Sequence, residues 1–489
     1  MRGITVSTKG ANKFVATRKM ANTAKSRLTH FKKWQAYLLW LLFSPTLFAA
    51  DLPDTVIAAL KRARIPLGSI AVEVRELNQP ALISVNAQQA MNPASTMKLL
   101  TTLSALEILG PAYRWKTEAY LDGTLNNGVL QGNLVFKGYG NPKLTIEQFW
   151  LWLHELHARG LREIQGDVIL DQSFFADLKI DPAEFDDDPS RAYNVTPNAL
   201  LVNFNALRLR LIPSTGVAWL EPNLANYTLV NNIRFTHQPT CPQKSNYQAR
   251  LDGRNIVLEG KLSSSCDETE KYFSLLSHND YFYALFQTLW QEVGGTLHGK
   301  LRLGNVPANQ PVFATHFSPP LSEAIRDINK FSNNTMARQL FLSLGTRTPA
   351  SIESSTAAIQ QWLTSQHLSF PELILENGAG LSRKERISAQ HLADLLQYNA
   401  TSPISAELVA SLPILGVDGT LKKRFQDHAG RGHAHIKTGS LTGVKSIAGY
   451  VSGKNGKQWI VVFIVNHARA AYSGVAQDAL VEWLEQGGI

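Results

Sequence analysis

The chain has 489 residues, 44% of them hydrophobic and 18% charged, a composition that predicts a globular protein of about three domains with an ample core. Its formal net charge is +9, but residues 1–50 hold nine Lys or Arg and no Asp or Glu. The remainder has 48 less nine, or 39, basic residues against 39 acidic ones, which removes the argument for a nucleic-acid partner.

Residues 1–50 have the pattern of a signal peptide. Basic residues up to Lys33 precede the apolar run 36–43, and the small pair Ala49-Ala50 follows. Even counted to Ala50, the apolar stretch is about 15 residues, whereas a membrane-spanning helix needs about 20. We therefore expect an exported, periplasmic chain with at most peripheral membrane contact. An uncleaved anchor is the alternative.

The region after the leader begins with a predicted helix over residues 54–64 and paired β-strands over residues 69–75 and 82–86. Ser95 and Lys98 then form an S-x-x-K string where a loop enters a helix with leucines at helical spacing. Alone, this string is more simply an N-cap followed by a solvated lysine.

A helix start also suits a nucleophilic serine. Free backbone N–H groups and the positive end of the helix dipole would favour negative charge developing near Ser95. Because residues three apart share a helix face, Lys98 can approach the Ser95 hydroxyl. A lysine activates a serine only after losing its own proton, and burial or a second cation lowers its pKa. Lys437 would be such a cation if it reaches the same cleft.

The long stretch from about residue 114 to residue 310 contains none of the motif strings. It is predicted to contain β-strands on either side of a helix over residues 146–157. The two cysteines of the chain, Cys241 and Cys266, both fall here. Because exported proteins meet oxidising conditions, a disulfide between them is expected, and two unpaired thiols are the alternative.

Ser332, Asn333 and Asn334 form an S-x-N string between two predicted helices, 321–330 and 335–344. A short connection of this kind can direct a hydroxyl and an amide into a cleft. A capped turn without a chemical role is the alternative.

Lys437, Thr438 and Gly439 form a K-T-G string, which chance supplies on the order of once in ten chains of this length. The string lies among β-rich segments, and an amphipathic helix over residues 475–484 follows them. On a strand edge, the lysine and threonine could bind a peptide carboxylate, and Gly439 would let the substrate backbone approach closely.

The order S-x-x-K, S-x-N and K-T-G resembles the penicillin-recognising serine acyl-transferases. Residues 376–383 and 412–421 are similar, more narrowly, to the D-alanyl-D-alanine carboxypeptidase/endopeptidase family, the class C low-molecular-mass penicillin-binding proteins. That family usually has Asp-Gly-Ser-Gly where this chain has Glu-Asn-Gly-Ala-Gly at residues 376–380, a difference that concerns local substrate contacts and not acylation. Ser332 follows Ser95 by 237 positions, far more than a compact β-lactamase needs.

The resemblance implies an α+β fold of the penicillin-binding or β-lactamase type. Its catalytic domain would have a five-stranded antiparallel sheet flanked by helices and a helical subdomain carrying Ser332, and a large insertion would form two further domains. The expected organisation is a signal peptide at residues 1–50, a catalytic domain in two parts at residues 51–113 and 311–489, and inserted accessory domains at residues 114–310.

The resemblance also implies a periplasmic serine-type D-Ala-D-Ala carboxypeptidase and DD-endopeptidase. Its partners would be peptidoglycan stem peptides, with β-lactams as covalent inhibitors, and it would need neither a metal nor an organic cofactor. Lys98 would take the proton of Ser95, and backbone N–H groups of Ser95 and Ser440 would hold the oxyanion. The other implied roles are proton relay and acyl-amide binding by Ser332 and Asn334, carboxylate binding by Lys437 and Thr438, and substrate contacts at Gly439 and Arg383.

Two alternatives remain. A serine β-lactamase shares the motifs but needs fast deacylation. The non-enzyme alternative is a catalytically idle peptidoglycan-binding scaffold. The intact S-x-x-K, S-x-N and K-T-G strings argue against it. The sequence leaves open the oligomeric state and the division between carboxypeptidase and endopeptidase activity.

Overall fold

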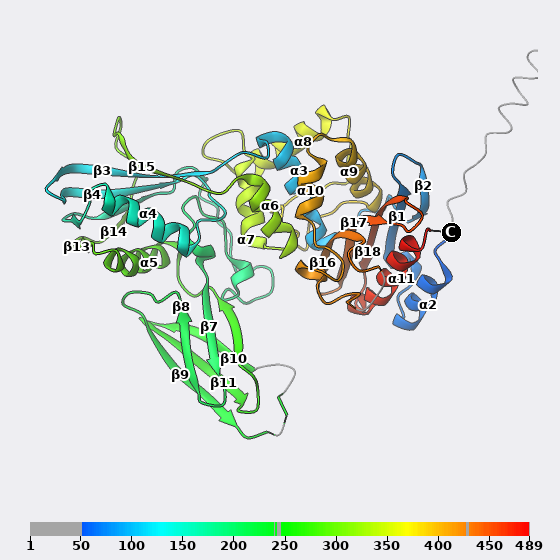
Figure 1. Cartoon of the computed structure of the whole chain (residues 1–489), viewed down its shortest axis with the longest axis horizontal. Helices are drawn as coiled ribbons and strands as arrows, with labels where there is room; N and C mark the ends of the chain where they lie inside the picture. The colour runs from blue at the N-terminus through cyan, green and yellow to red at the C-terminus, as the bar shows by residue number, and fades with distance from the viewer. Residues whose placement is uncertain (1–50, 239, 242–245, 427–429, 489) are drawn as a thin grey trace, which may run out of the picture. The chain divides into compact units, whose positions relative to one another are not determined.

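The computed structural model describes residues 51–238, 240–241, 246–426 and 430–488. The predicted signal peptide at residues 1–50 lies outside them. Residues 51–115 and 318–488 form one unit, here called the terminal unit, and residues 116–317 form the insertion (Figure 1). Within the described residues, no helix combines the length and the hydropathy that a membrane span requires.

Five antiparallel strands form the sheet of the terminal unit, in the order β16-β17-β18-β1-β2 (Figure 1). β1 from the N-terminal part pairs with β18 from the C-terminal part, with Ile70 opposite Val465. The predicted five-stranded antiparallel sheet is thus confirmed. The strands span Ile70–Glu76 (β1), Ala81–Val85 (β2), Ala434–Leu441 (β16), Val444–Ser452 (β17) and Gln458–Asn466 (β18).

Helices cover both faces of this sheet. α2 (Asp54–Ala63) and α11 (Gly474–Glu485) pack on one face, where odd-numbered residues of β18 such as Phe463 are buried. Even-numbered residues such as Val462 enter the core of the helices on the other face. Because both faces are covered, β18 is an almost continuous apolar run without polar alternation.

The helices on the second face surround α3, which is buried on nearly all sides. Lys98 is the first residue of α3. Because the start of this helix is buried, the Lys98 side chain lies inside the protein. The helices of this layer span Lys98–Leu109 (α3), Leu321–Lys330 (α6), Asn334–Ser343 (α7), Ile352–Ser365 (α8), Ala389–Thr401 (α9) and Ser405–Ser411 (α10).

The insertion is built on a mixed seven-stranded sheet that shares a core with α4 (Ile146–Ala158) and α5 (His278–Glu292). Its last strand, β15, pairs with β3. The sheet therefore continues past residue 310, the predicted boundary, as far as Phe317. Its strands span Lys116–Asn126 (β3), Val129–Gly138 (β4), Glu163–Ile164 (β5), Val168–Asp171 (β6), Thr296–Leu297 (β13), Leu301–Leu303 (β14) and Val312–Phe317 (β15).

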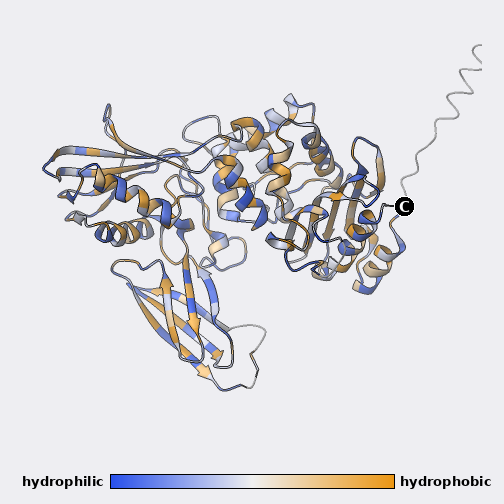
Figure 2. Ribbon diagram, viewed as in Figure 1, coloured by the Kyte–Doolittle hydropathy of each residue, from blue (hydrophilic) through white to orange (hydrophobic). Residues whose placement is uncertain are grey.

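Two three-stranded sheets, in the orders β12-β7-β8 and β10-β11-β9, complete the insertion. Along β7, buried residues alternate with partly exposed ones, as expected for strands with one face on a core. Figure 2 shows hydrophobic and hydrophilic residues mixed along the strands of these sheets. The strands span Leu207–Ile212 (β7), Val217–Glu221 (β8), Thr228–Thr236 (β9), Asn246–Asp252 (β10), Asn255–Ser263 (β11) and Thr269–Phe273 (β12).

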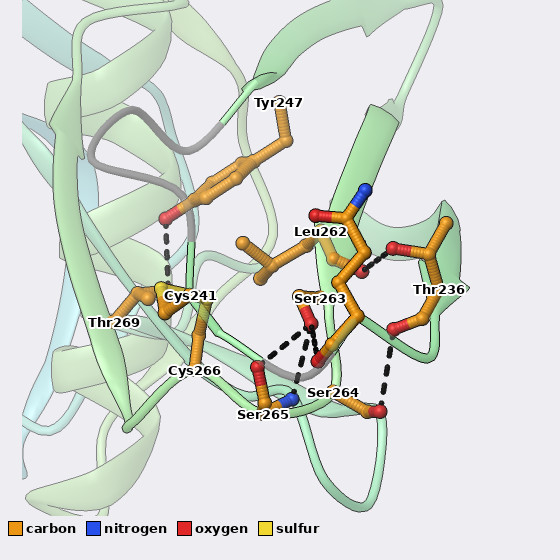
Figure 3. The surroundings of a disulfide bond; sticks show 10 residues. Thr236, Cys241, Tyr247, Leu262, Ser263, Ser264, Ser265, Cys266 and Thr269 are labelled. Atoms are coloured by element: carbon orange, nitrogen blue, oxygen red, sulfur yellow. Dashed lines mark hydrogen bonds between the residues drawn. A yellow bond between two sulfur atoms is a disulfide. The ribbon is translucent and has the colours of Figure 1, made fainter.

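Cys241 and Cys266 form a disulfide at one end of these sheets (Figure 3). Cys266 belongs to the small hydrophobic core between the two sheets, which also includes Tyr247. The Tyr247 hydroxyl lies 3.1 Å from Thr269 Oγ1 beside the bridge (Figure 3). The disulfide expected for an exported chain is therefore present, and it closes a loop beside this small core.

Candidate active site

The three motif strings meet at one cleft of about 370 Å³. They reach it from the turn before α3, from the connection between α6 and α7, and from β16, an edge strand of the sheet. The cleft is lined by residues of all three strings, Ser95, Ser332, Asn334, Thr438 and Gly439, and by Ser440 after the third string. Folding thus brings the three motif strings together at one cleft.

Ser95 lies in a single 3-10 turn, Ala94–Met97, that leads directly into α3. The preceding Ala94 has a φ of 47°, a left-handed conformation that is uncommon for alanine. Its N–H donates to Asn92 Oδ1 at 2.9 Å, and Asn92 Nδ2 donates to the carbonyl of Ser382 at 2.8 Å. Ser95 is therefore presented on a constrained backbone beside a helix start.

Two glycines make room for the Ser95 backbone. A Cβ on Gly439 would lie 2.8 Å from the Pro93 carbonyl oxygen and 2.9 Å from the Ser95 nitrogen. A Cβ on Gly380 would lie 1.9 Å from the Ala94 carbonyl oxygen. The glycine of K-T-G is thus required by the protein's own packing, in addition to any approach of a substrate.

Lys98 is fully buried, and its Nζ has three oxygen atoms within hydrogen-bond distance. Lys98 Nζ lies 3.0 Å from Ser95 Oγ, 2.6 Å from Asn334 Oδ1 and 2.5 Å from the carbonyl oxygen of Ala379. The base and the nucleophile predicted from S-x-x-K are therefore in hydrogen-bond contact. Asn334 of S-x-N orients the same amine.

Burial lowers the pKa of Lys98 well below its ordinary value, and the nearby charge of Lys437 lowers it further. The carboxylate of Glu385 acts in the opposite direction, and Arg338 adds to the lowering. Burial also lowers the pKa of Lys437, to about 7. The site thus favours an uncharged Lys98 amine, which is the form able to accept a proton.

Ser332 has a φ of 56°, so the backbone turns sharply between α6 and α7. The Asn333 side chain caps α7 by accepting from the N–H of Met336 at 3.0 Å. The capped turn considered as an alternative is therefore present, and it directs Ser332 and Asn334 into the cleft on either side of the cap.

Lys437 is fully buried on β16, and its ammonium points at Ser332. Its Nζ donates to Ser332 Oγ at 2.9 Å and to the carbonyl of Thr438 at 2.9 Å. Lys437 does not line the cleft, whereas Thr438 does, with its hydroxyl 2.8 Å from Thr420 Oγ1. Carboxylate binding by Lys437, which the resemblance implied, stays a prediction.

Arg383 lies outside the lining of this cleft. It donates to the carbonyl of Thr442 at 2.9 Å, and its guanidinium lies 4.7 Å from the ring centroid of Phe185, a residue of the insertion. Arg383 and Phe185 line an adjoining cavity of about 360 Å³, and Leu381 borders both spaces. The structure therefore places Arg383 beside the reacting groups and not among them.

Glu385 and Arg338 could not be identified from the sequence as part of this site. Glu385 is fully buried, and its Oε1 accepts from the N–H groups of Glu376, Asn377 and Gly378 at 2.9 to 3.1 Å. This carboxylate shapes the loop whose Ala379 carbonyl contacts Lys98. The segment in which the chain departs from the usual family pattern thus supports the base itself.

Residues 54–487 match the family model described as D-Ala-D-Ala carboxypeptidase 3 (S13), and the chain belongs to this family. The D-alanyl-D-alanine carboxypeptidase DacB of Haemophilus influenzae is 26% identical over 450 residues, covering 88% of this chain and 91% of that protein. The D-alanyl-D-alanine carboxypeptidase of Actinomadura sp. (strain R39) is 27% identical over 419 residues, covering 82% and 78%.

Solved structures agree with the sequence comparison. The crystal structure of penicillin binding protein 4 (dacB) from Haemophilus influenzae superposes with a TM-score of 0.75 at 26% identity, covering 88% of this chain and 99% of that one. The same protein complexed with a novel β-lactam gives a TM-score of 0.71. The α+β, penicillin-binding-protein fold expected from the motifs is confirmed.

Proposed function

We propose that the protein is a periplasmic serine-type D-Ala-D-Ala carboxypeptidase and DD-endopeptidase that acts on peptidoglycan stem peptides and is acylated by β-lactams at Ser95. The observation that carries this proposal is the buried amine of Lys98, 3.0 Å from Ser95 Oγ. Membership of the S13 family and the names of the relatives support the reaction class.

The contacts of Lys98 fit a neutral amine, which has two N–H bonds and one lone pair. Asn334 Oδ1 and the Ala379 carbonyl can accept the two N–H bonds. The lone pair then faces Ser95 Oγ and accepts the hydroxyl proton. A charged lysine would have no lone pair for this step.

In acylation, Lys98 takes the Ser95 proton while Oγ attacks the carbonyl carbon of the penultimate D-Ala. Backbone N–H groups of Ser95 and Ser440 hold the developing oxyanion. Ser332 passes a proton to the leaving amine and takes one back from the ammonium of Lys437, which is bonded to Ser332 Oγ. The proton of Ser95 stays on Lys98. The peptide bond breaks and the acyl group remains on Ser95 as an ester.

In deacylation, water attacks the ester and gives a proton to Lys437 through Ser332, while Lys98 returns its proton to Ser95. No step of this sequence calls for a metal or an organic cofactor. The insertion contributes to placing the substrate, because Phe185 and Glu184 of the insertion share a cavity with Arg383 and Leu381 at the border of the cleft.

Labelled penicillin tests the proposal. After incubation with the purified protein, peptide mapping should place the penicilloyl group on Ser95, and Ser95→Ala should remain unlabelled with an unchanged circular dichroism spectrum. Label on another serine would overturn the site. Rapid loss of label with continuous penicillin hydrolysis would favour a β-lactamase, and absence of label and of D-Ala release would favour the scaffold.

A further inference from the structure

A second cavity, of about 580 Å³, adjoins the cleft on the side of Ser332. It is lined by residues of α6, by Phe331, and by residues 417–419 and 422, and is here called the α6 cavity. Two chain segments run from one space into the other. Phe331 lines the α6 cavity and the next residue, Ser332, lines the cleft; Gly419 lines the α6 cavity and the next residue, Thr420, lines the cleft.

Ion pairs fix the walls of the α6 cavity. Lys143, a residue of the insertion, has its Nζ 2.8 Å from Glu323 Oε1 and 2.8 Å from Asp327 Oδ2, both on α6. Lys330 at the end of α6 has its Nζ 2.6 Å from Asp418 Oδ2. Each of the three carboxylates that line the cavity is therefore bonded to a lysine of the same lining.

The lining has two further cations, Arg326 and Lys422, and both side chains are exposed. The charge of Arg326 also acts on Asp418, which is already bonded to Lys330. Among the described residues, four cations and three carboxylates line the cavity, so it favours an anionic ligand. Phe331 is 67% exposed and Val417 41%, and they add apolar surface beside the charges. This combination suits a peptide that carries carboxylates.

The proposed reaction identifies the part of the substrate that lies on this side of the cleft. Because Ser332 passes a proton to the leaving amine, the leaving group lies against the α6–α7 connection. A leaving D-Ala is a single residue, about 3.3 Å of extended chain, and can end inside the cleft. The amine released from a cross-link belongs to a second stem peptide, which must continue out of the cleft. The α6 cavity begins where that peptide passes Ser332 and Thr420.

We propose that the α6 cavity binds the leaving stem peptide of a peptidoglycan cross-link, with Arg326 and Lys422 contacting its carboxylates and Phe331 its apolar part. This inference rests on the proposed function and names a substrate site for its endopeptidase reaction. Cleavage of cross-links then depends on residues that the carboxypeptidase reaction does not use, because a single leaving D-Ala does not reach them.

The test compares two substrates with the same donor stem peptide and different leaving groups. One is a pentapeptide ending in D-Ala-D-Ala, and the other is a cross-linked dimer of the stem peptide. The double variant Arg326→Gln and Lys422→Gln should lower kcat/KM for the dimer by about 3- to 20-fold, the contribution of two solvent-exposed ion pairs. D-Ala release from the pentapeptide and penicillin acylation of Ser95 should stay within about two-fold of the wild type.

Two controls separate this site from a general effect of charge. Lys61→Gln with Arg62→Gln removes two exposed cations from α2 and should change neither substrate. A dimer whose leaving strand has amidated carboxylates should be cleaved by the wild type about as slowly as the acidic dimer is cleaved by the double variant. The variant should cleave the amidated dimer as fast as the wild type does.

An equal loss on the pentapeptide and the dimer, or an unchanged kcat/KM for the dimer, would overturn the inference while the proposed function stands. A wild-type protein that releases D-Ala but leaves the dimer intact would overturn the inference and the endopeptidase reaction together. A wild-type protein that is neither acylated by penicillin nor active on either substrate would overturn the proposed function as a whole.

Discussion

The terminal unit and the insertion differ in how their strands are buried. In β18 of the terminal unit, residues 459–465 are all buried, because helices cover both faces. In β9 of the insertion, only Ile233 is buried and the other residues reach solvent. Figure 2 shows the corresponding mixture of hydrophobic and hydrophilic residues along the strands of the insertion.

This difference explains where the reacting groups are placed. Side chains packed from both sides are held in one rotamer, and a proton transfer between two of them needs that fixed geometry. The helical layer and the sheet fix Lys98 and Lys437 from opposite sides of the cleft. The thin sheets of the insertion lack this support and are instead joined by a disulfide. Substitutions should therefore abolish chemistry in the first region, whereas those in the two three-stranded sheets of the insertion should affect only stability.

The largest effect is expected for Lys98→Arg. A guanidinium stays protonated at every relevant pH, so it cannot accept the Ser95 proton. We expect the rate of penicillin acylation to fall by about 10²- to 10⁴-fold, the usual contribution of a general base. Stopped-flow acylation with the folded variant measures this rate. A near-normal acylation rate would show that another group acts as the base.

A somewhat smaller loss is expected for Gly439→Ala. The added methyl group would lie 2.3 Å from Ser446 Oγ and 2.9 Å from the Ser95 nitrogen, so β16 and the Ser95 turn must separate. A displacement of about 1 Å at reacting groups can reduce rates by about 10²-fold. Gly68→Ala is the control, since a Cβ there meets no atom within 4 Å. Equal acylation rates in the two variants would contradict the packing argument.

The sequence predicted much of this region because the motifs carry their own local signals. Spacing and neighbouring residues predict the helix start at Ser95, the S-x-N connection and the strand with Lys437. Glu385 was not, because a glutamate between polar residues is typical of a solvated loop, and its burial depends on three backbone N–H groups that only folding supplies. The contact of Lys437 with Ser332 could not be predicted for a similar reason, since the direction of its ammonium depends on the position of Ser332.

A third prediction concerns pH. Lys437 has a pKa of about 7, so below that pH it carries a charge that opposes protonation of Lys98. Lys437→Gln removes this charge, and the pKa of Lys98 should rise. Activity is lost as the pH falls through the Lys98 pKa, so the acid limb of the kcat/KM profile should move to higher pH, whatever the overall rate. An unchanged or lower acid limb would show that Lys437 does not control the base.

The smallest effect on activity is expected in the insertion, for the double variant Cys241→Ser and Cys266→Ser. The sequence separation of 25 makes the bridge worth about 3 kcal/mol in the free energy of unfolding on the chain-entropy model. Because the core between these sheets is small, the insertion depends on the disulfide for stability. We expect the insertion of the double variant to unfold at a lower temperature than that of the wild type under oxidising conditions. The rate of penicillin acylation should stay unchanged, because among the described residues this core includes neither Ser95 and Lys98 nor any other residue of the turn and helix that hold them. Calorimetry and acylation of the same sample measure both quantities.

A fall in acylation at a temperature where the variant is folded would show that the insertion helps to position the reacting groups. The contrast between the two regions would then be lost.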